Sequence, residues 1–205
     1  MCWRFTAALF VLTLAQAWGQ GDALAAGKFL VASRELGDPN FAQTVVLLVS
    51  YDSEKGAMGL IVNRQTEVPM SRLFQDLKGA KGRSDPVYVG GPVELETVQG
   101  LLKSSSKPGA DAKHVFGDVY LITSKELFEK TLASQADASI FHIYVGYAGW
   151  GAGQLEHEID LGGWHVMAAD ASNVFHSEPD SVWPRLIKRT EMQIAQHRPM
   201  PIAQP

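Results

Sequence analysis

The most constraining feature of this 205-residue chain is a glycine-rich stretch at residues 146–159, which reads GYAGWGAGQLEHEI. Its first half is typical of a β-strand, and its polar second half favours a helix. The glycines between them permit a tight corner in which the backbone approaches other atoms closely. A glycine loop before a helix N-terminus also presents backbone N–H groups that bind anions. The stretch therefore predicts either a packed corner or an anion cradle.

The spacing of these glycines restricts the anion hypothesis. Gly149, Gly151 and Gly153 do not form the G-x-G-x-x-G fingerprint of dinucleotide sites, and no G-K-[ST] follows them. The simpler interpretation is that the glycines turn the chain around Trp150 and that Gln154 begins the helix. We therefore expect Trp150 to be buried or half-buried. Gly149, Gly151, Gly153 and Gln154 stay as candidate ligand-binding residues.

Short apolar runs separated by turn residues predict strands along most of the chain. The clearest is TVVLLV at 44–49, whose unbroken apolar sequence predicts burial on both faces. It is expected to form a hairpin with 57–63. Other strands are predicted at 29–33, 87–89, 97–102, 115–122, 140–147 and 164–168. Helices are predicted at 69–77, after a Thr123 cap, at 154–159 and at 181–189, with a helical turn that starts at Asp170 or Ser172 and ends near Phe175. Because strands and helices interleave without regular βαβ spacing, we predict an α+β fold with a mixed or antiparallel sheet.

The first 25 residues differ in character from the rest. One cation, Arg4, precedes an apolar run at 5–17, and two small-x-small sites end at Ala17 and Ala25. This is the layout of a secretory signal peptide, and the run is too short for a membrane span. The predicted organisation is a signal peptide at 1–25, a single domain at 26–190 and a flexible tail at 191–205. The protein would then be periplasmic or secreted. Because the start is weakly charged, a mis-assigned start codon and a cytoplasmic protein remain the alternative.

Charge and cysteine content exclude several functional classes. The net charge of −4 disfavours nucleic-acid binding as a primary role. Basic residues cluster at 78–83 and 185–189, and we interpret both clusters as solvated surface. The one cysteine, Cys2, lies in the predicted signal peptide. A cleaved chain would therefore have no disulfide, thiol nucleophile or cysteine-ligated metal.

No pattern in the sequence predicts a catalytic or metal site. A G-x-S-x-G nucleophile elbow is absent, and Ser33 has no identifiable base. The triplet EHE at 156–158 lacks the H-E-x-x-H spacing, and adjacent helical residues point about 100° apart. We interpret the triplet as surface charge, although His142 and His165 lie on strands predicted to be neighbours. No catalytic residue, metal or cofactor is therefore predicted.

Asn63 and Arg64 end a predicted strand and form the second candidate site. An arginine at such a position binds a ligand carboxylate or phosphate, and equally it can tie down a loop. Both interpretations stay open from the residues alone.

Several ordered motifs resemble those of one family. They are FLVAS at 29–33, D-P-x-F at 38–41, TVVLL at 44–48, GAMGLIVNR at 56–64, GGPV at 90–93 and GYAGWGxGQLE at 146–156. This pattern resembles the YqgE/AlgH family of bacterial proteins over roughly residues 27 to 189. The resemblance implies an α+β domain in which curved sheets form a barrel-like core flanked by helices. It carries over no catalytic residue, because the family has none assigned.

Four residues depart from the usual family pattern: Arg34, Gln43, Gln65 and Ala152. Together with the predicted leader they suggest an exported subgroup, which argues against the transcriptional role attached to some members. The leading hypothesis is a non-enzymatic binding or regulatory protein of the cell envelope, with an unknown small molecule or protein as partner. The alternatives are an enzyme acting on a small anionic substrate near Asn63, Arg64 and the glycine stretch, and a cytoplasmic transcriptional regulator. The oligomeric state is left open.

Overall fold

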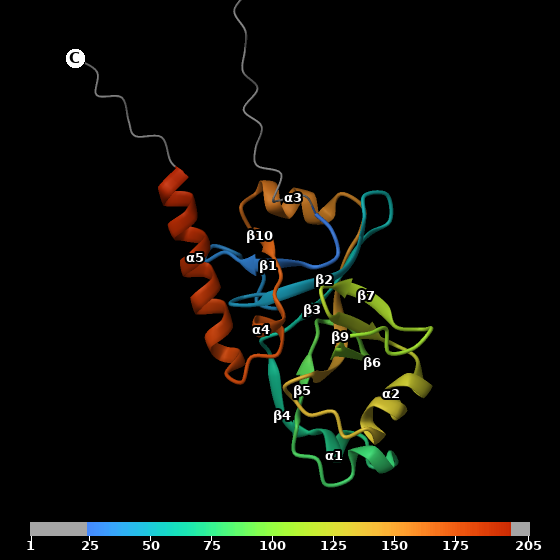
Figure 1. Cartoon of the computed structure of the whole chain (residues 1–205). Coiled ribbons are helices and arrows are strands. Elements are labelled where there is room, and N and C mark those ends of the chain that lie inside the picture. The colour runs from blue at the N-terminus through green and yellow to red at the C-terminus, as the bar shows by residue number, and fades with distance from the viewer. Residues whose placement is uncertain (1–23, 198–205) are drawn as a thin grey trace, which may run out of the picture.

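The computed structural model describes residues 24–197, whose arrangement is shown in Figure 1. The strands are β1 (Lys28–Ala32), β2 (Val45–Asp52), β3 (Gly56–Ile61), β4 (Gln65–Pro69), β5 (Pro86–Val89), β6 (Val93–Lys103), β7 (Lys113–Phe116), β8 (Val119–Ile122), β9 (Phe141–Trp150) and β10 (Trp164–Ala168). The helical segments are α1 (Met70–Leu73), η1 (Lys78–Ala80), α2 (Lys125–Ala133), α3 (Gln154–Asp160), α4 (Ala171–Val174), η2 (Pro179–Ser181) and α5 (Val182–His197). Nearly all of the predicted signal peptide, residues 1–23, and residues 198–205 of the predicted tail lie outside the described residues.

The strands form one curled sheet in the order β10-β1-β2-β3-β9-β6-β8-β7. Neighbours along this path are antiparallel, whereas β5 joins β9 in parallel and pairs with β4. The central strand β9 therefore contacts β3, β5 and β6. As Figure 1 shows, the sheet curls into a half-barrel with helices along its sides. The predicted α+β fold with a mixed, curved sheet is confirmed.

Two apolar clusters cover the sheet, and they lie on opposite faces of β9. Alternation along β9 places Phe141 and Ile143 in the smaller cluster and Tyr144 and Ala148 in the larger one. In β2, the five residues Val45 to Val49 are all fully buried, as expected for a strand packed on both faces. The predicted hairpin of this strand with β3 is also confirmed.

The helix predicted at 69–77 is wrong in extent. A strand, β4, runs through Pro69, and only Met70–Leu73 is helical. Met70 and Phe74 still reach the smaller cluster, but they do so from successive turns. Leu73, which was expected on the same apolar face, is 46% exposed. Apolar spacing alone therefore could not separate one helix from a series of turns.

The single strand predicted at 115–122 is in fact a hairpin. Gly117 adopts a left-handed conformation with φ +48° and separates β7 from the antiparallel β8. The helix that follows begins one residue later than expected, because Ser124 rather than Thr123 caps it. The Ser124 hydroxyl oxygen accepts a hydrogen bond from the Leu127 N–H at 3.4 Å.

The last helix, α5, closes one side of the half-barrel and is longer than predicted (Figure 1). It continues to His197 and so includes residues 191–197 of the predicted tail. The indole N–H of Trp183 donates to the Ala32 carbonyl oxygen at 2.8 Å, which fixes the helix against β1. The Arg34 guanidinium pairs with Glu191 at 2.6 Å further along. Within residues 24–197, no helix is both long and apolar enough to cross a bilayer.

Candidate functional site

Asn63 lies just beyond β3 and is 8% exposed. Its amide oxygen accepts from the Val45 N–H at 2.7 Å, and its amide nitrogen donates to the Gln43 carbonyl oxygen at 3.0 Å. Both ends of this side chain therefore hold the entry to β2. Asn63 performs the loop-tying role that its sequence position left open.

Arg64 holds the same loop from its exposed side. Its Nη1 donates to the Asn40 carbonyl oxygen at 2.7 Å, and Nη2 makes a longer contact of 3.5 Å with the Ala42 carbonyl oxygen. A guanidinium has five N–H donors, so these contacts leave three for other partners. Arg64 is thus fixed in position by the chain while keeping donors for a ligand.

The loop held by these residues, 38–44, is anchored on its other side by aromatic contacts. The Phe41 ring stacks on Trp150 with centroids 5.9 Å apart and meets Trp164 edge-on at 5.5 Å. Gln43, at the end of the loop, has φ +57°, a conformation that a non-glycine residue adopts at a cost. The loop is therefore held by specific contacts on both of its sides.

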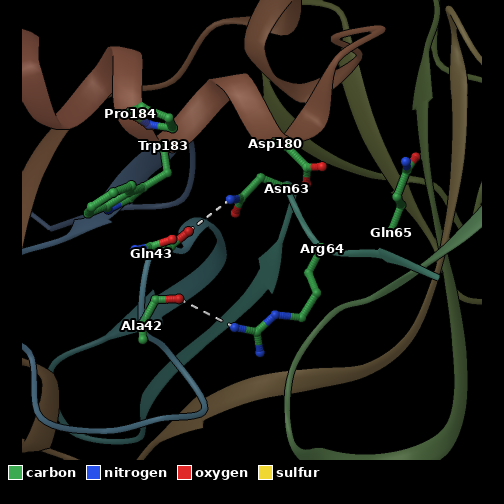
Figure 2. Close-up of a pocket in the computed structure, with 8 residues that line it drawn as sticks. All are labelled: Ala42, Gln43, Asn63, Arg64, Gln65, Asp180, Trp183 and Pro184. Atoms are coloured by element: carbon green, nitrogen blue, oxygen red, sulfur yellow. Dashed lines mark hydrogen bonds between the residues drawn. The ribbon is translucent and has the colours of Figure 1, made fainter.

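Between this loop and the start of α5 lies a recess of about 270 Å³, which we call the Arg64 recess. Its lining consists of Ala42, Gln43, Asn63, Arg64, Gln65, Asp180, Trp183 and Pro184. In Figure 2, Asp180, Trp183 and Pro184 extend from the helical segment, while Ala42 and Arg64 lie on the opposite side. Two of the four positions that depart from the family pattern, Gln43 and Gln65, line this recess.

The glycine candidates lie elsewhere. Gly149 belongs to β9, Gly153 caps α3 with φ +75°, and the loop proper is residues 151–153. We call residues 149–154 the glycine corner. It packs at the Gly56 end of β3, whereas Asn63 follows the other end of that strand. None of Gly149, Gly151, Gly153 and Gln154 lines the Arg64 recess. The structure therefore does not bring the two sets of candidates together.

The polar groups of the glycine corner are used by the chain itself. The Gln154 side-chain oxygen accepts from the Gly151 N–H at 3.1 Å, and its Nε2 donates to Glu158 at 3.0 Å. Gln154 begins α3 as predicted, but this helix has only seven residues and so a weak N-terminal dipole. The corner supports packing better than anion binding.

Packing around the corner centres on two tryptophans. Trp150 is 5% exposed, as predicted, and Trp164 is 3% exposed. The Glu158 Oε2 atom accepts from both indole N–H groups, at 3.0 Å from Trp150 and 2.8 Å from Trp164. The interpretation of residues 156–158 as plain surface charge is therefore wrong for Glu158. No group of metal-binding side chains occurs within residues 24–197.

Glu156 also has a specific partner. The Tyr51 hydroxyl donates to its carboxylate at 2.6 Å, and this hydrogen bond raises the pKa of Tyr51. Both acidic residues of the EHE triplet are thus used to hold α3 onto the sheet.

The histidines considered for a metal site and the serine considered for catalysis are not assembled into a site. His142 lies on β9 and His165 on β10, and three strands separate these two in the sheet, contrary to expectation. The His142 ring stacks on Tyr88 at 4.5 Å, and burial lowers its pKa to about 4. Burial also lowers the pKa of His165. The Ser33 hydroxyl is buried and has no hydrogen-bond partner among the described residues.

A second recess of about 520 Å³ lies near η1 and the end of α2, with Lys81, Arg83, Asp85 and Asp137 in its lining. The Arg83 Nε donates to Asp85 at 2.8 Å, and this hydrogen bond lowers the pKa of that carboxyl. Arg83 also donates to the Ala136 carbonyl oxygen. The Arg83 charge is thus paired inside the protein, whereas its Nη1 atom is buried with no hydrogen-bond partner among the described residues.

Comparison with known proteins places the chain in a family. The model of the AlgH-like family matches residues 29–195. The chain belongs to this family. It is 33% identical over 177 residues to a UPF0301 protein of Streptomyces avermitilis, covering 82% of this chain and 88% of the relative. It is 40% identical over 152 residues to a UPF0301 protein of Paraburkholderia phymatum, covering 72% and 78% of the two chains.

Solved structures show the same fold. The solution structure of the AlgH protein from Pseudomonas aeruginosa superposes with a TM-score of 0.66 and 28% identity, over 85% of this chain and 94% of that one. A protein from Corynebacterium diphtheriae gives a TM-score of 0.70 at 21% identity, over 89% of this chain and 92% of that one. The latter likeness concerns the fold alone. Together these matches confirm the family resemblance drawn from the motifs.

Sequence reasoning found Asn63 and Arg64 but missed the other half of the recess. Asp180 comes from η2, and Trp183 and Pro184 come from the start of α5, far along the chain. No local pattern marks them, because Trp183 has the spacing of an ordinary core residue. Only the docking of α5 against β1 brings them to Arg64.

Proposed function

We propose that this AlgH-like protein is a non-enzymatic binding protein of the cell envelope, and that its ligand carries an anionic group bound in the Arg64 recess. The observation that carries the proposal is the guanidinium of Arg64 at the wall of a recess of about 270 Å³. Two loop carbonyls hold it in place, so it loses little further freedom on binding. Arginine donors in a fixed orientation favour carboxylate and phosphate.

The absence of an activated nucleophile supports binding over catalysis. Among the described residues, the Ser33 hydroxyl has no partner to act as a base. The His142 ring, which is buried, packs between Tyr88 and Phe175. The enzyme hypothesis joined Asn63 and Arg64 to the glycine stretch, and these lie at opposite ends of β3. That hypothesis therefore loses its geometric basis.

The transcriptional alternative receives no support from the basic clusters. Arg83 is paired with Asp85, and Arg185 contacts His176 at 3.0 Å as well as Asn173. The pairing with Asp85 makes Arg83 poor at neutralising phosphates, and the net charge of −4 disfavours nucleic acid as the primary partner. DNA binding at low salt would revive this alternative.

The binding proposal is tested by calorimetric titration with inorganic phosphate, acetate, L-alanine and N-acetyl-L-alanine at low salt. We expect at least one of these carboxylate- or phosphate-bearing ligands to bind, and Gln43→Glu to weaken that binding about tenfold, because it adds a negative charge beside Arg64. Gln196→Glu, at the exposed end of α5, is the matched control and should bind as the wild type does. If none of the four ligands binds, or if Gln43→Glu binds them as tightly as the wild type, the proposal is wrong.

The cellular location is tested separately. The proposal predicts a mature N-terminus after Ala17 or Ala25 in the periplasmic or secreted fraction, because residues 1–25 have the layout of a signal peptide. N-terminal sequencing of the native protein after cell fractionation measures this. An intact Met1 terminus in the cytosol would show that the protein is cytoplasmic and would contradict the envelope location.

A further inference from the structure

The Arg64 recess contains two opposite charges that do not neutralise each other. Asp180 lines the same recess as Arg64 and is exposed to solvent. Within residues 24–197, no ion pair joins these two side chains, and Asp180 makes no other ion pair there. An unpaired carboxylate in the lining repels a ligand that carries only negative charge. Both charges are therefore available to one ligand.

We infer that the recess selects a zwitterion of amino-acid size, whose carboxylate meets Arg64 and whose ammonium meets Asp180. This inference rests on the proposed function, since it takes the Arg64 recess as the ligand site. A ligand with one charge meets attraction on one side of the recess and repulsion on the other. A zwitterion with the matching orientation meets attraction on both sides, so complementarity gives selectivity in addition to affinity.

The remaining lining suits the rest of such a ligand. Pro184 has no backbone N–H, and the indole N–H of Trp183 is already bound to Ala32, so this side offers apolar contact without donors. Gln43 and Gln65 supply side-chain amides that both donate and accept. At about 270 Å³, the recess lies below the range of about 300 to 1,000 Å³ usual for drug-sized ligands. A single amino acid therefore fits better than a peptide.

Asp180 can be replaced to test this selectivity without disturbing the fold. It lies in the short segment η2, and no side-chain hydrogen bond of its own holds this segment. Its replacement by asparagine removes a charge without removing a contact on which the fold depends. Asp76→Asn, at another exposed aspartate, is the matched control.

The test compares three probes on the full chain: L-alanine, N-acetyl-L-alanine and L-alaninamide, each measured by calorimetric titration. L-alanine should bind at least tenfold tighter than either derivative. Asp180→Asn should weaken L-alanine about tenfold and strengthen N-acetyl-L-alanine, since the variant loses both the ammonium partner and the source of repulsion. Asp76→Asn should leave all three affinities unchanged.

The outcomes separate the inference from the function on which it rests. If N-acetyl-L-alanine or phosphate binds and L-alanine binds no tighter, the zwitterion inference is overturned while the anion site stands. If Asp180→Asn shifts both ligands in the same direction, the inference is also overturned. If neither of these anions nor L-alanine binds, the inference and the proposed function fail together.

Discussion

The glycine corner and the Arg64 recess are built from similar polar groups, yet the chain occupies them to different degrees. At the corner, the Gly151 N–H, both ends of the Gln154 amide and the Glu158 carboxylate are all bound within the protein. In the recess, Arg64 keeps donors and Asp180 has no ion-pair partner among the described residues. A glycine loop that resembles an anion site can therefore be a purely structural corner. Binding capacity is better judged by the polar groups left over than by the presence of glycines.

The largest effect is expected from a substitution that disturbs the glycine corner. Gly56 has φ +100°, and a Cβ built there would lie 2.1 Å from the Trp150 carbonyl oxygen. Gly56→Ala should therefore lower the free energy of unfolding by about 4 kcal/mol, from backbone strain and overpacking together. Urea denaturation measures this, with Gly37→Ala as control, because a Cβ at Gly37 meets no atom within 4 Å. Equal stability of the two variants would show that the corner tolerates more than its geometry indicates.

The second prediction concerns the structural half of the recess. Asn63→Ala should lower the free energy of unfolding by about 3 kcal/mol, because the Val45 N–H and the Gln43 carbonyl oxygen both lose a buried partner. Asn40→Ala is the control, since Asn40 contributes only its backbone oxygen to Arg64. Chemical denaturation of both variants gives the difference. A loss no larger than that of Asn40→Ala would mean that the loop 38–44 is held mainly by Phe41.

The third prediction concerns a polar group in neither region. His142 is buried against Tyr88, Tyr144 and Phe175, with Asp85 as the nearby charge, and its pKa is lowered from 6.5 to about 4. The unfolded chain thus takes up the proton first. Stability is full above pH 6.5 and falls as the pH drops through 6.5 toward 4, with a loss of about 2 kcal/mol by pH 5. Denaturation curves between pH 8 and pH 5 measure this slope.

The matched variant for the pH prediction is His142→Gln. Its absolute stability can differ from that of the wild type, but the part of the slope due to the imidazole should disappear. A variant that retains the full slope would assign the acid sensitivity to other groups, for example to His165, whose pKa is also lowered from 6.5 by burial.

Features that depend on residues close together in the sequence could be predicted, whereas features that depend on contacts between distant segments could not. The β2–β3 hairpin, the burial of Trp150 and the start of α3 at Gln154 all depend on local patterns, and all three are confirmed. The recess could be predicted only on the Arg64 side, because Asp180 reaches it through the docking of α5. The turn at Gly117 was missed although two turn-favouring residues, Gly117 and Asp118, interrupt the apolar run there. Local periodicity therefore gives elements and burial, while unpaired charges emerge only from tertiary contacts.

The smallest predicted effect tests the opposite extreme, a polar group with no partner at all. Gln99 is 1% exposed and lies opposite Tyr144 in the sheet, and neither end of its amide has a hydrogen bond within residues 24–197. Because an unpaired buried amide opposes folding, Gln99→Met, of similar length, should raise the free energy of unfolding by about 1 kcal/mol. Urea denaturation measures the change, and Gln196→Met on the exposed end of α5 should change stability little. A destabilised Gln99→Met variant would mean that a buried water satisfies the amide, and Gln99 would then belong with the occupied groups of the glycine corner.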